Sequence, residues 1–193
     1  MTTDRERVGG VVAAQRPRRA DARRNFDALL AAAREAFAEK GGEASLEDVA
    51  RRAGVGIGTL YRNFPTRQVL FETVYADEVD ALCRLAEEVA GAADPWQALT
   101  TWLHRFVEYT VTKRAVREAM SGESEIFVSC RRAMLDAGEP LLLRAQRSGA
   151  VRPEVTFDDL LRMVSGVAGA SYVDDAQRDR VLTYALNGIH RTP

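Results

Sequence analysis

The sequence predicts an all-α protein with two parts, a small N-terminal helical domain and a larger C-terminal helical bundle. Apolar residues recur with a period near 3.6 along most of the chain, and no stretch keeps the alternating pattern of a strand. The length of 193 residues is sufficient for two compact units. Hydrophobic residues make up 46% of the chain and charged residues 28%, which is typical of a globular protein.

The first predicted helix covers residues 21–40, where an alanine-rich segment carries an apolar stripe. Gly41-Gly42 follows it as a stop signal. Residues 1–20 mix Arg, Gly and Pro without periodicity, and we expect them to form a mobile arm. Five arginines crowd the junction between arm and helix: Arg16, Arg18, Arg19, Arg23 and Arg24. Such a cluster suits contact with phosphates, and a solvated tail is the alternative.

Two short helices with a tight turn between them come next. Ser45 is the expected N-cap of the first, which ends at Gly54. The second runs from Ile57 to about Phe64, because Pro65 prevents its continuation. Two short helices joined in this way form a helix-turn-helix.

The remaining predicted helices are long and amphipathic. Thr66 caps a helix over residues 67–90, whose length suggests a spine that links one unit to another. Four more helices are expected over residues 95–120, 123–146 with Pro140 inside, 157–172 and 174–189.

Charge and cysteine content narrow the classes of function. Residues 1–66 carry 12 Lys and Arg against 9 Asp and Glu, whereas residues 67–193 carry 15 against 19, so the N-terminal third is the basic part. The chain has no run of about 18 apolar residues and no secretory signal, which favours a cytoplasmic protein without membrane contact. Cys83 and Cys130 lack a CxxC pattern or a histidine cluster, so we expect reduced thiols rather than a redox pair, and no metal or cofactor.

The segment 45–67, SLEDVARRAGVGIGTLYRNFPTR, carries the functional signal. Its last helix has small residues first and hydrogen-bond donors after them: Gly56, Gly58, Thr59, Tyr61, Arg62 and Asn63. A helix with little bulk at its leading end fits the major groove of DNA, where its backbone N–H groups come close to phosphates and base edges.

This segment resembles the DNA-binding signature of the TetR/AcrR repressors. The matching positions are a Gly-Val turn, a Thr-Leu-Tyr triplet, a Phe and a basic residue that opens the next helix: Gly54-Val55, Thr59-Leu60-Tyr61, Phe64 and Arg67. The resemblance implies that Thr59 and Tyr61 contact backbone phosphate or a base edge. It also implies that Ser45, Thr66 and Arg67 anchor their helices on the phosphate backbone.

Two positions depart from the commonest family pattern, which has His where this chain has Asn63 and Lys where it has Arg67. Both replacements can donate to phosphate, so they bear on base preference rather than on DNA binding. Arg62 is the candidate for bidentate reading of a guanine, a contact worth about 1 to 3 kcal/mol of discrimination, and a second phosphate contact is the alternative. Taken singly, Tyr61 and Arg62 could be a half-buried core residue and a solvated charge, but the motif as a set favours DNA contact.

The C-terminal part resembles the family more loosely. There the resemblance implies a cavity for a small-molecule effector and a homodimer formed through the last two long helices. Aromatic side chains are the candidates for lining the cavity: Trp102, Phe106, Tyr109 and Phe127. For each of them ordinary core packing is the alternative.

Together these features predict a sequence-specific transcriptional regulator with a flexible basic arm (1–20), a helix-turn-helix DNA-binding domain (21–66) and a ligand-binding and dimerisation domain (67–193). The favoured hypothesis is a repressor that a small-molecule effector releases from a palindromic operator in double-stranded DNA. One alternative is a DNA-binding protein without an effector. The other is an enzyme, which is disfavoured because the sequence has no nucleophile motif, metal-ligand spacing or phosphate loop.

Overall fold

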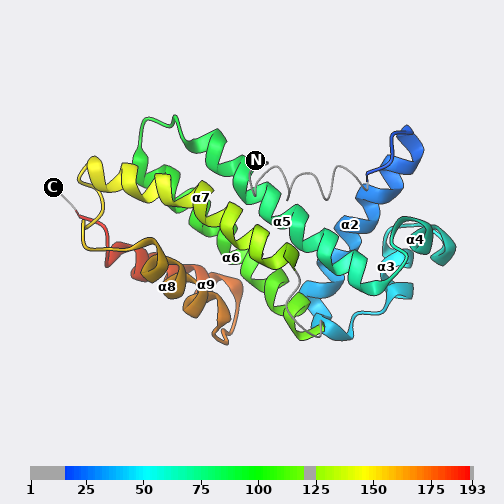
Figure 1. The fold of residues 1–193 in the computed structure, drawn as a ribbon. Helices are drawn as coiled ribbons and strands as arrows, with labels where there is room; N and C mark the ends of the chain where they lie inside the picture. Colours follow the sequence, from blue (N-terminus) through cyan, green and yellow to red (C-terminus); the bar gives the residue numbers. More distant parts are fainter. Residues whose placement is uncertain (1–15, 120–124, 192–193) are drawn as a thin grey trace. The chain divides into compact units, whose positions relative to one another are not determined.

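A computed structural model describes residues 16–119 and 125–191, which are mostly helical (Figure 1). The elements are α2 (Ala20–Lys40), the short 3-10 helix η1 (Gly41–Glu43), α3 (Leu46–Arg52), α4 (Ile57–Asn63), α5 (Arg67–Val89), α6 (Pro95–Ala119), α7 (Glu125–Arg147), α8 (Phe157–Gly169) and α9 (Asp175–Asn187). The described residues contain no strand, only an isolated antiparallel bridge between Val151 and His190. The predicted all-α fold is confirmed.

The helix ends follow the capping residues. Ser45 Oγ accepts a hydrogen bond from the Asp48 backbone N–H at 3.0 Å, and Thr66 Oγ1 accepts one from Val69 N–H at 3.2 Å, as the sequence predicts for two N-caps. Gly54 lies in the turn after α3 with a φ of 69°, a conformation that favours glycine.

Two of the expected C-terminal ends are wrong, because α8 ends at Gly169 and α9 at Asn187 rather than at residues 172 and 189. Ala170 is already extended, and the chain then positions Asp174, whose Oδ1 accepts from Gln177 N–H at 2.7 Å as the N-cap of α9. The apolar pattern continues past the end of α8, so periodicity alone does not show where the chain turns towards α9. Figure 1 shows α8 and α9 as neighbours, and the two helices are in contact.

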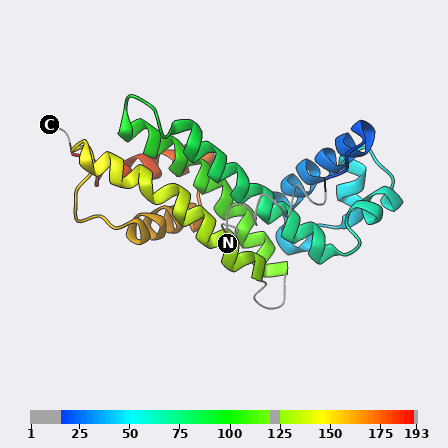
Figure 2. The same cartoon turned by 45° about the horizontal axis from the view of Figure 1, so that its top comes forward.

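The chain divides into two compact units. The described parts of residues 1–80 and 112–133 form the first unit, in which α2, α3 and α4 pack together (Figure 2). Its core contains two aromatic pairs that include α2 residues: Phe26 with Phe64, ring centroids 5.0 Å apart, and Phe37 stacked on Phe71 at 4.1 Å. Helix α2 therefore holds both the end of α4 and the start of α5.

An ion-pair cluster in the same unit joins α2 to α5. Arg34 Nη2 donates to Asp77 Oδ2 at 2.6 Å, and Arg34 Nε lies 2.5 Å from Glu78 Oε1. The Glu78 side chain is only 2% exposed, so its charge depends on nearby cations and hydrogen bonds rather than on water. This cluster fixes α2 on α5.

The second unit comprises residues 81–111 and the described part of 134–193. Trp102 is fully buried there, and its indole N–H donates to the Leu82 carbonyl oxygen at 3.0 Å, which ties α6 to α5. A Cβ added at Gly138 of α7 would lie 2.5 Å from Phe157 Cζ and 2.7 Å from a ring carbon of Trp102. Close packing of α7 on this aromatic cluster therefore requires glycine.

Candidate nucleic-acid interface

Helix α4 has one buried side and one exposed side. Leu60 and Phe64 have no exposed surface and anchor the helix in the core of the first unit. Tyr61 is 47% exposed and Ile57 39%, although both are large side chains with apolar surface. Exposed aromatic surface on a short helix is typical of a contact surface rather than of a core.

The two glycines at the start of α4 are not required by the packing of the protein. A Cβ added at Gly56 or Gly58 would meet no atom within 4 Å. The positive φ angles among the described residues belong to Gly41, Gly54 and Gly149, so neither α4 glycine needs glycine's conformational freedom. Gly58 therefore lowers the intrinsic stability of the helix, and no contact in the folded chain requires glycine there.

Two of the predicted DNA-contacting side chains fold back along α4. Arg62 Nε donates to the Gly58 carbonyl oxygen at 3.1 Å, and Arg62 Nη2 donates to Thr59 Oγ1 at 3.0 Å. Asn63 Nδ2 donates to the Thr59 carbonyl oxygen at 2.8 Å. Asn63 is half-buried, so the structure places it at the edge of the exposed side and Arg62 on it.

The anchoring residues outside α4 also have partners within the protein. Ser45 and Thr66 are exposed N-caps, and each hydroxyl keeps its own hydrogen for a further acceptor. Arg67 is half-buried, donates to the Gly42 carbonyl oxygen, and has its guanidinium 5.0 Å from the centroid of the Phe71 ring. Arg67 thus fastens the start of α5 to η1.

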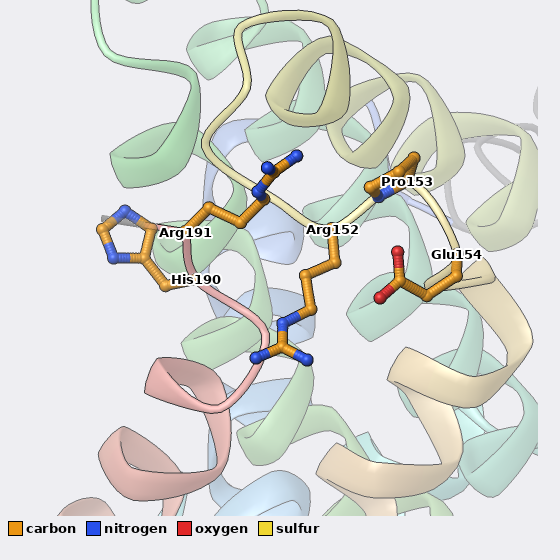
Figure 3. A pocket seen from close by; sticks show the side chains of 5 residues that line it. All are labelled: Arg152, Pro153, Glu154, His190 and Arg191. Carbon is orange, nitrogen blue, oxygen red and sulfur yellow. The ribbon is translucent and has the colours of Figure 1, made fainter. Parts of the chain in front are cut away.

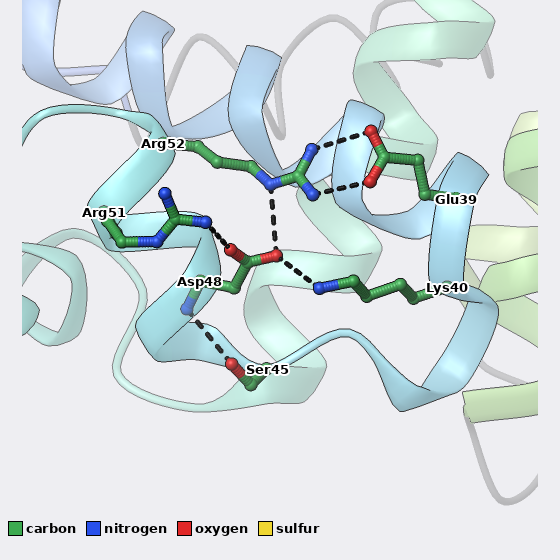
Figure 4. Close-up of polar contacts among 6 residues, drawn as sticks. All are labelled: Glu39, Lys40, Ser45, Asp48, Arg51 and Arg52. Atoms are coloured by element: carbon green, nitrogen blue, oxygen red, sulfur yellow. Dashed lines mark hydrogen bonds and ion pairs between the residues drawn. The ribbon is translucent and has the colours of Figure 1, made fainter.

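A charged cluster around Asp48 connects α2 with α3 (Figure 4). The Asp48 carboxylate accepts from Lys40 Nζ at 2.9 Å, from Arg52 Nε at 3.1 Å and from Arg51. Arg52 also forms two bonds to the Glu39 carboxylate, at 2.8 and 2.5 Å. Hydrogen bonds from Lys40, Arg51 and Arg52 hold the pKa of Asp48 well below its usual range, so the carboxylate stays ionised at neutral pH.

Our sequence interpretation did not include Asp48 among the functional residues, although the Ser-x-x-Asp spacing from Ser45 is a helix-start signal. Asp48 lies in the first turn of α3, next to the N-cap Ser45, and its contacts fix the start of this helix. It also neutralises part of the charge of Arg51 and Arg52, for which the sequence indicated no role.

The predicted basic arm lies largely outside the described residues, which begin at 16. Among the described arginines of the cluster, Arg16 pairs with Asp27 at 2.6 Å and Arg24 pairs with Asp21. The other three are exposed near the start of α2: Arg18, Arg19 and Arg23. Because α2 begins at Ala20, part of the cluster belongs to the helix rather than to the arm.

In comparisons with known proteins, each half of the chain matches a family model. Residues 29–74 match the model of the bacterial regulatory proteins of the tetR family, and residues 94–191 match the C-terminal domain of SbtR-like transcriptional regulators. This chain belongs to the TetR family of transcriptional regulators. The predicted family is therefore confirmed, and DNA binding as the general function is supported.

Solved structures of TetR-family regulators agree along most of this chain. It is 35% identical to SCO0520 from Streptomyces coelicolor, with a TM-score of 0.74 over 87% of this chain and 99% of that one. It is 30% identical to a TetR regulator from Mycobacterium vanbaalenii, with a TM-score of 0.68 over 91% and 100% of the two chains.

A curated relative, the HTH-type transcriptional regulator SAR0097 from Staphylococcus aureus (strain MRSA252), is 32% identical over 85 residues. The match covers 42% of this chain and spans less than half of that regulator, 44% of its length.

The aromatic residues predicted to line an effector cavity are distributed over both units of this TetR-family protein. Trp102, Phe106 and Tyr109 are buried in the second unit, where Phe106 lies 5.7 Å from Trp102 and 5.4 Å from Tyr109 between ring centroids. Phe127 is half-buried in the first unit, with its ring edge-on to Tyr75 at 4.7 Å. The first three therefore form one continuous aromatic cluster, and Phe127 belongs to a separate pair.

A pocket that the sequence did not indicate lies in the second unit (Figure 3). It has a volume of about 530 Å³ and is lined by Arg152, Pro153, Glu154, His190 and Arg191. The Arg191 N–H donates to the Ala150 carbonyl oxygen at 2.9 Å, and the His190 ring stacks on Trp96 at 4.3 Å, which fixes one wall. Its lining residues come from segments far apart in the sequence, so no local pattern reveals it.

In the part of the chain that the structure describes, no helix is long and apolar enough to cross a membrane. Within the same residues, no three His, Cys, Asp or Glu side chains are grouped as metal ligands. Cys83 and Cys130 are both buried and free of disulfides.

Proposed function

We propose that this TetR-family protein is a repressor that binds a palindromic operator through α4. The observation that carries the proposal is the division of α4 into a buried anchor and an exposed, glycine-opened side with Tyr61 and Arg62. A helix of this kind fits the major groove, and the N-caps Ser45 and Thr66 lie at helix starts that suit phosphate contact. The proposed DNA contacts are Ser45, Gly56, Gly58, Thr59, Tyr61, Arg62, Asn63, Thr66 and Arg67.

The proposed boundaries follow from this assignment: a basic arm over 1–20, the DNA-binding domain over 21–66 and the effector and dimerisation domain over 67–193. TetR regulators bind DNA and ligands and act as dimers. We assign the dimer contact to α8 and α9, where Tyr184 is 69% exposed and Val173, in the connection between the helices, is 90% exposed. Exposed apolar side chains on a paired helical surface are typical of an interface. A repressor of this kind acts where the DNA is, in the cytoplasm.

The effector side of the proposal rests on the buried aromatic cluster of the second unit. Trp102, Phe106 and Tyr109 supply the apolar walls that small-molecule sites use, and Phe127 is the remaining candidate. An effector that binds one arrangement of the dimer more tightly changes the separation of the two α4 helices and so weakens operator binding by linkage.

Selection of random duplex DNA against the purified protein tests the function. We expect an enriched palindrome whose half-sites lie about one helical turn apart and whose affinity falls steeply with salt. Tyr61→Ala should weaken binding to all sequences alike, whereas Leu143→Ala, at an exposed residue of α7, should leave operator binding unchanged. Failure of the wild-type protein to enrich any sequence contradicts operator binding, and compounds that release the enriched site identify effectors.

A further inference from the structure

Arg62 has one edge of its guanidinium bound and the other edge free. Its Nε donates to the Gly58 carbonyl oxygen at 3.1 Å, and its Nη2 donates to Thr59 Oγ1 at 3.0 Å. An arginine has five N–H donors in a rigid plane, and these two bonds use the edge formed by Nε and Nη2. The end formed by Nη1 and Nη2 keeps one N–H of each nitrogen directed outward in parallel.

Two parallel N–H groups are what a guanine requires, because its O6 and N7 accept a bidentate pair in the major groove. We propose that Thr59 is a positioning residue that holds Arg62 ready to read a guanine, rather than only a contact of its own to DNA. This inference rests on the proposed function, since it assumes that α4 enters the groove.

The local sequence supports this arrangement at each contact. Gly58 has no side chain beside its carbonyl oxygen, and Arg62 reaches that oxygen from four residues further along. Thr59 lies three residues before Arg62 and is half-buried, which limits the freedom of its hydroxyl. Asn63 Nδ2 bonds to the Thr59 carbonyl oxygen at 2.8 Å, so Asn63 does not compete with Arg62 for the hydroxyl.

An arginine side chain that is already ordered in the free protein loses less conformational entropy on binding DNA than a mobile one does. Loss of the Thr59 hydroxyl should therefore reduce discrimination for guanine at the Arg62 position by about threefold to tenfold, the range set by ordering one flexible side chain. Thr59→Val keeps the shape and removes the acceptor. Thr59→Ser keeps the acceptor and serves as the matched control.

A double-mutant cycle on the selected operator and on the operator with that base pair replaced tests the inference. We expect Thr59→Val to reduce guanine discrimination in the wild-type background and to change it little in the Arg62→Ala background. Thr59→Ser should retain discrimination. Equal losses from Thr59→Val in both backgrounds, or unchanged discrimination after Arg62→Ala, would overturn the inference while operator binding itself stands.

A measurement without DNA separates this inference from the proposed function. In the free protein, hydrogen exchange of the Arg62 Nη2 protons, followed by NMR, should be slow in the wild type and in Thr59→Ser, and faster in Thr59→Val. Fast exchange in the wild type shows that the guanidinium is not held and also overturns the inference. If exchange is slow as expected but no operator is enriched, the proposed function is contradicted, and so is the inference that Arg62 recognises a guanine.

Discussion

Replacing Arg34 by methionine should lower the free energy of unfolding by about 1.5 to 3 kcal/mol, because it removes a guanidinium that lies against a buried carboxylate. Glu78 is 2% exposed, and Arg34 Nε lies 2.5 Å from its Oε1. Methionine keeps most of the apolar stem of arginine, so the loss comes from charge rather than from packing. Urea denaturation of Arg34→Met and the wild type, followed by circular dichroism, measures the difference.

The same substitution at Arg24 is the control for this prediction. Arg24 pairs with Asp21 on the same helix, but the two side chains are 71% and 87% exposed, so Arg24→Met should cost less than about 1 kcal/mol. Equal and small losses for both methionine variants would show that the α2–α5 pair does not hold the first unit together.

Trp102→Ala should lower the free energy of unfolding by about 3 to 5 kcal/mol, the usual cost of removing a large aromatic side chain from a packed core. Trp102 has no exposed surface, contacts the rings of Phe106 and Phe157, and donates to Leu82 O at 3.0 Å. Trp102→Phe should cost less, because it retains part of the ring volume and loses the indole N–H. Thermal and urea unfolding of the three proteins provide the measurement.

Trp96 offers the matched comparison, since its ring is half-buried and stacks on His190 at 4.3 Å. Trp96→Ala should therefore cost clearly less than Trp102→Ala. If Trp102→Ala is nearly neutral, Trp102 borders an open cavity rather than a packed core.

The predicted elements of the first unit agree with the structure because their signals are local. Glycine and proline stops, N-caps and the apolar stripe act within a few residues, so Ser45, Gly54 and Pro65 were sufficient to place α3 and α4. The end of α8 was misplaced because an apolar stripe continues beyond it while Asp174 already caps the next helix. Hydrophobic periodicity identifies the buried face of a helix but not the residue at which the helix ends.

The candidate site shows the same division between local and long-range information. The exposed side of α4 lies opposite Leu60 and Phe64, which are four residues apart, so a helix places both on one side, and both are buried. The bond between Arg67 and Gly42 and the ion pairs of Arg34 with α5 join residues more than 20 positions apart, and no pattern in one sequence links them. Which aromatic side chains pack against each other depends on contacts between helices, as the separate positions of Trp102 and Phe127 illustrate.

The central claim, that α4 lies in a DNA groove, is tested most directly by Gly58→Ala measured for stability and for operator affinity in the same preparation. An added Cβ meets no atom of the protein within 4 Å. The substitution should therefore raise the free energy of unfolding by up to about 1 kcal/mol through helix propensity. The same methyl group should lower operator affinity about tenfold, equivalent to about 1.4 kcal/mol, because it keeps the helix backbone from the DNA. Gly91→Ala, equally unobstructed and outside α4, should leave affinity unchanged. A stabilised Gly58→Ala protein that binds the operator as tightly as the wild type would contradict the claim.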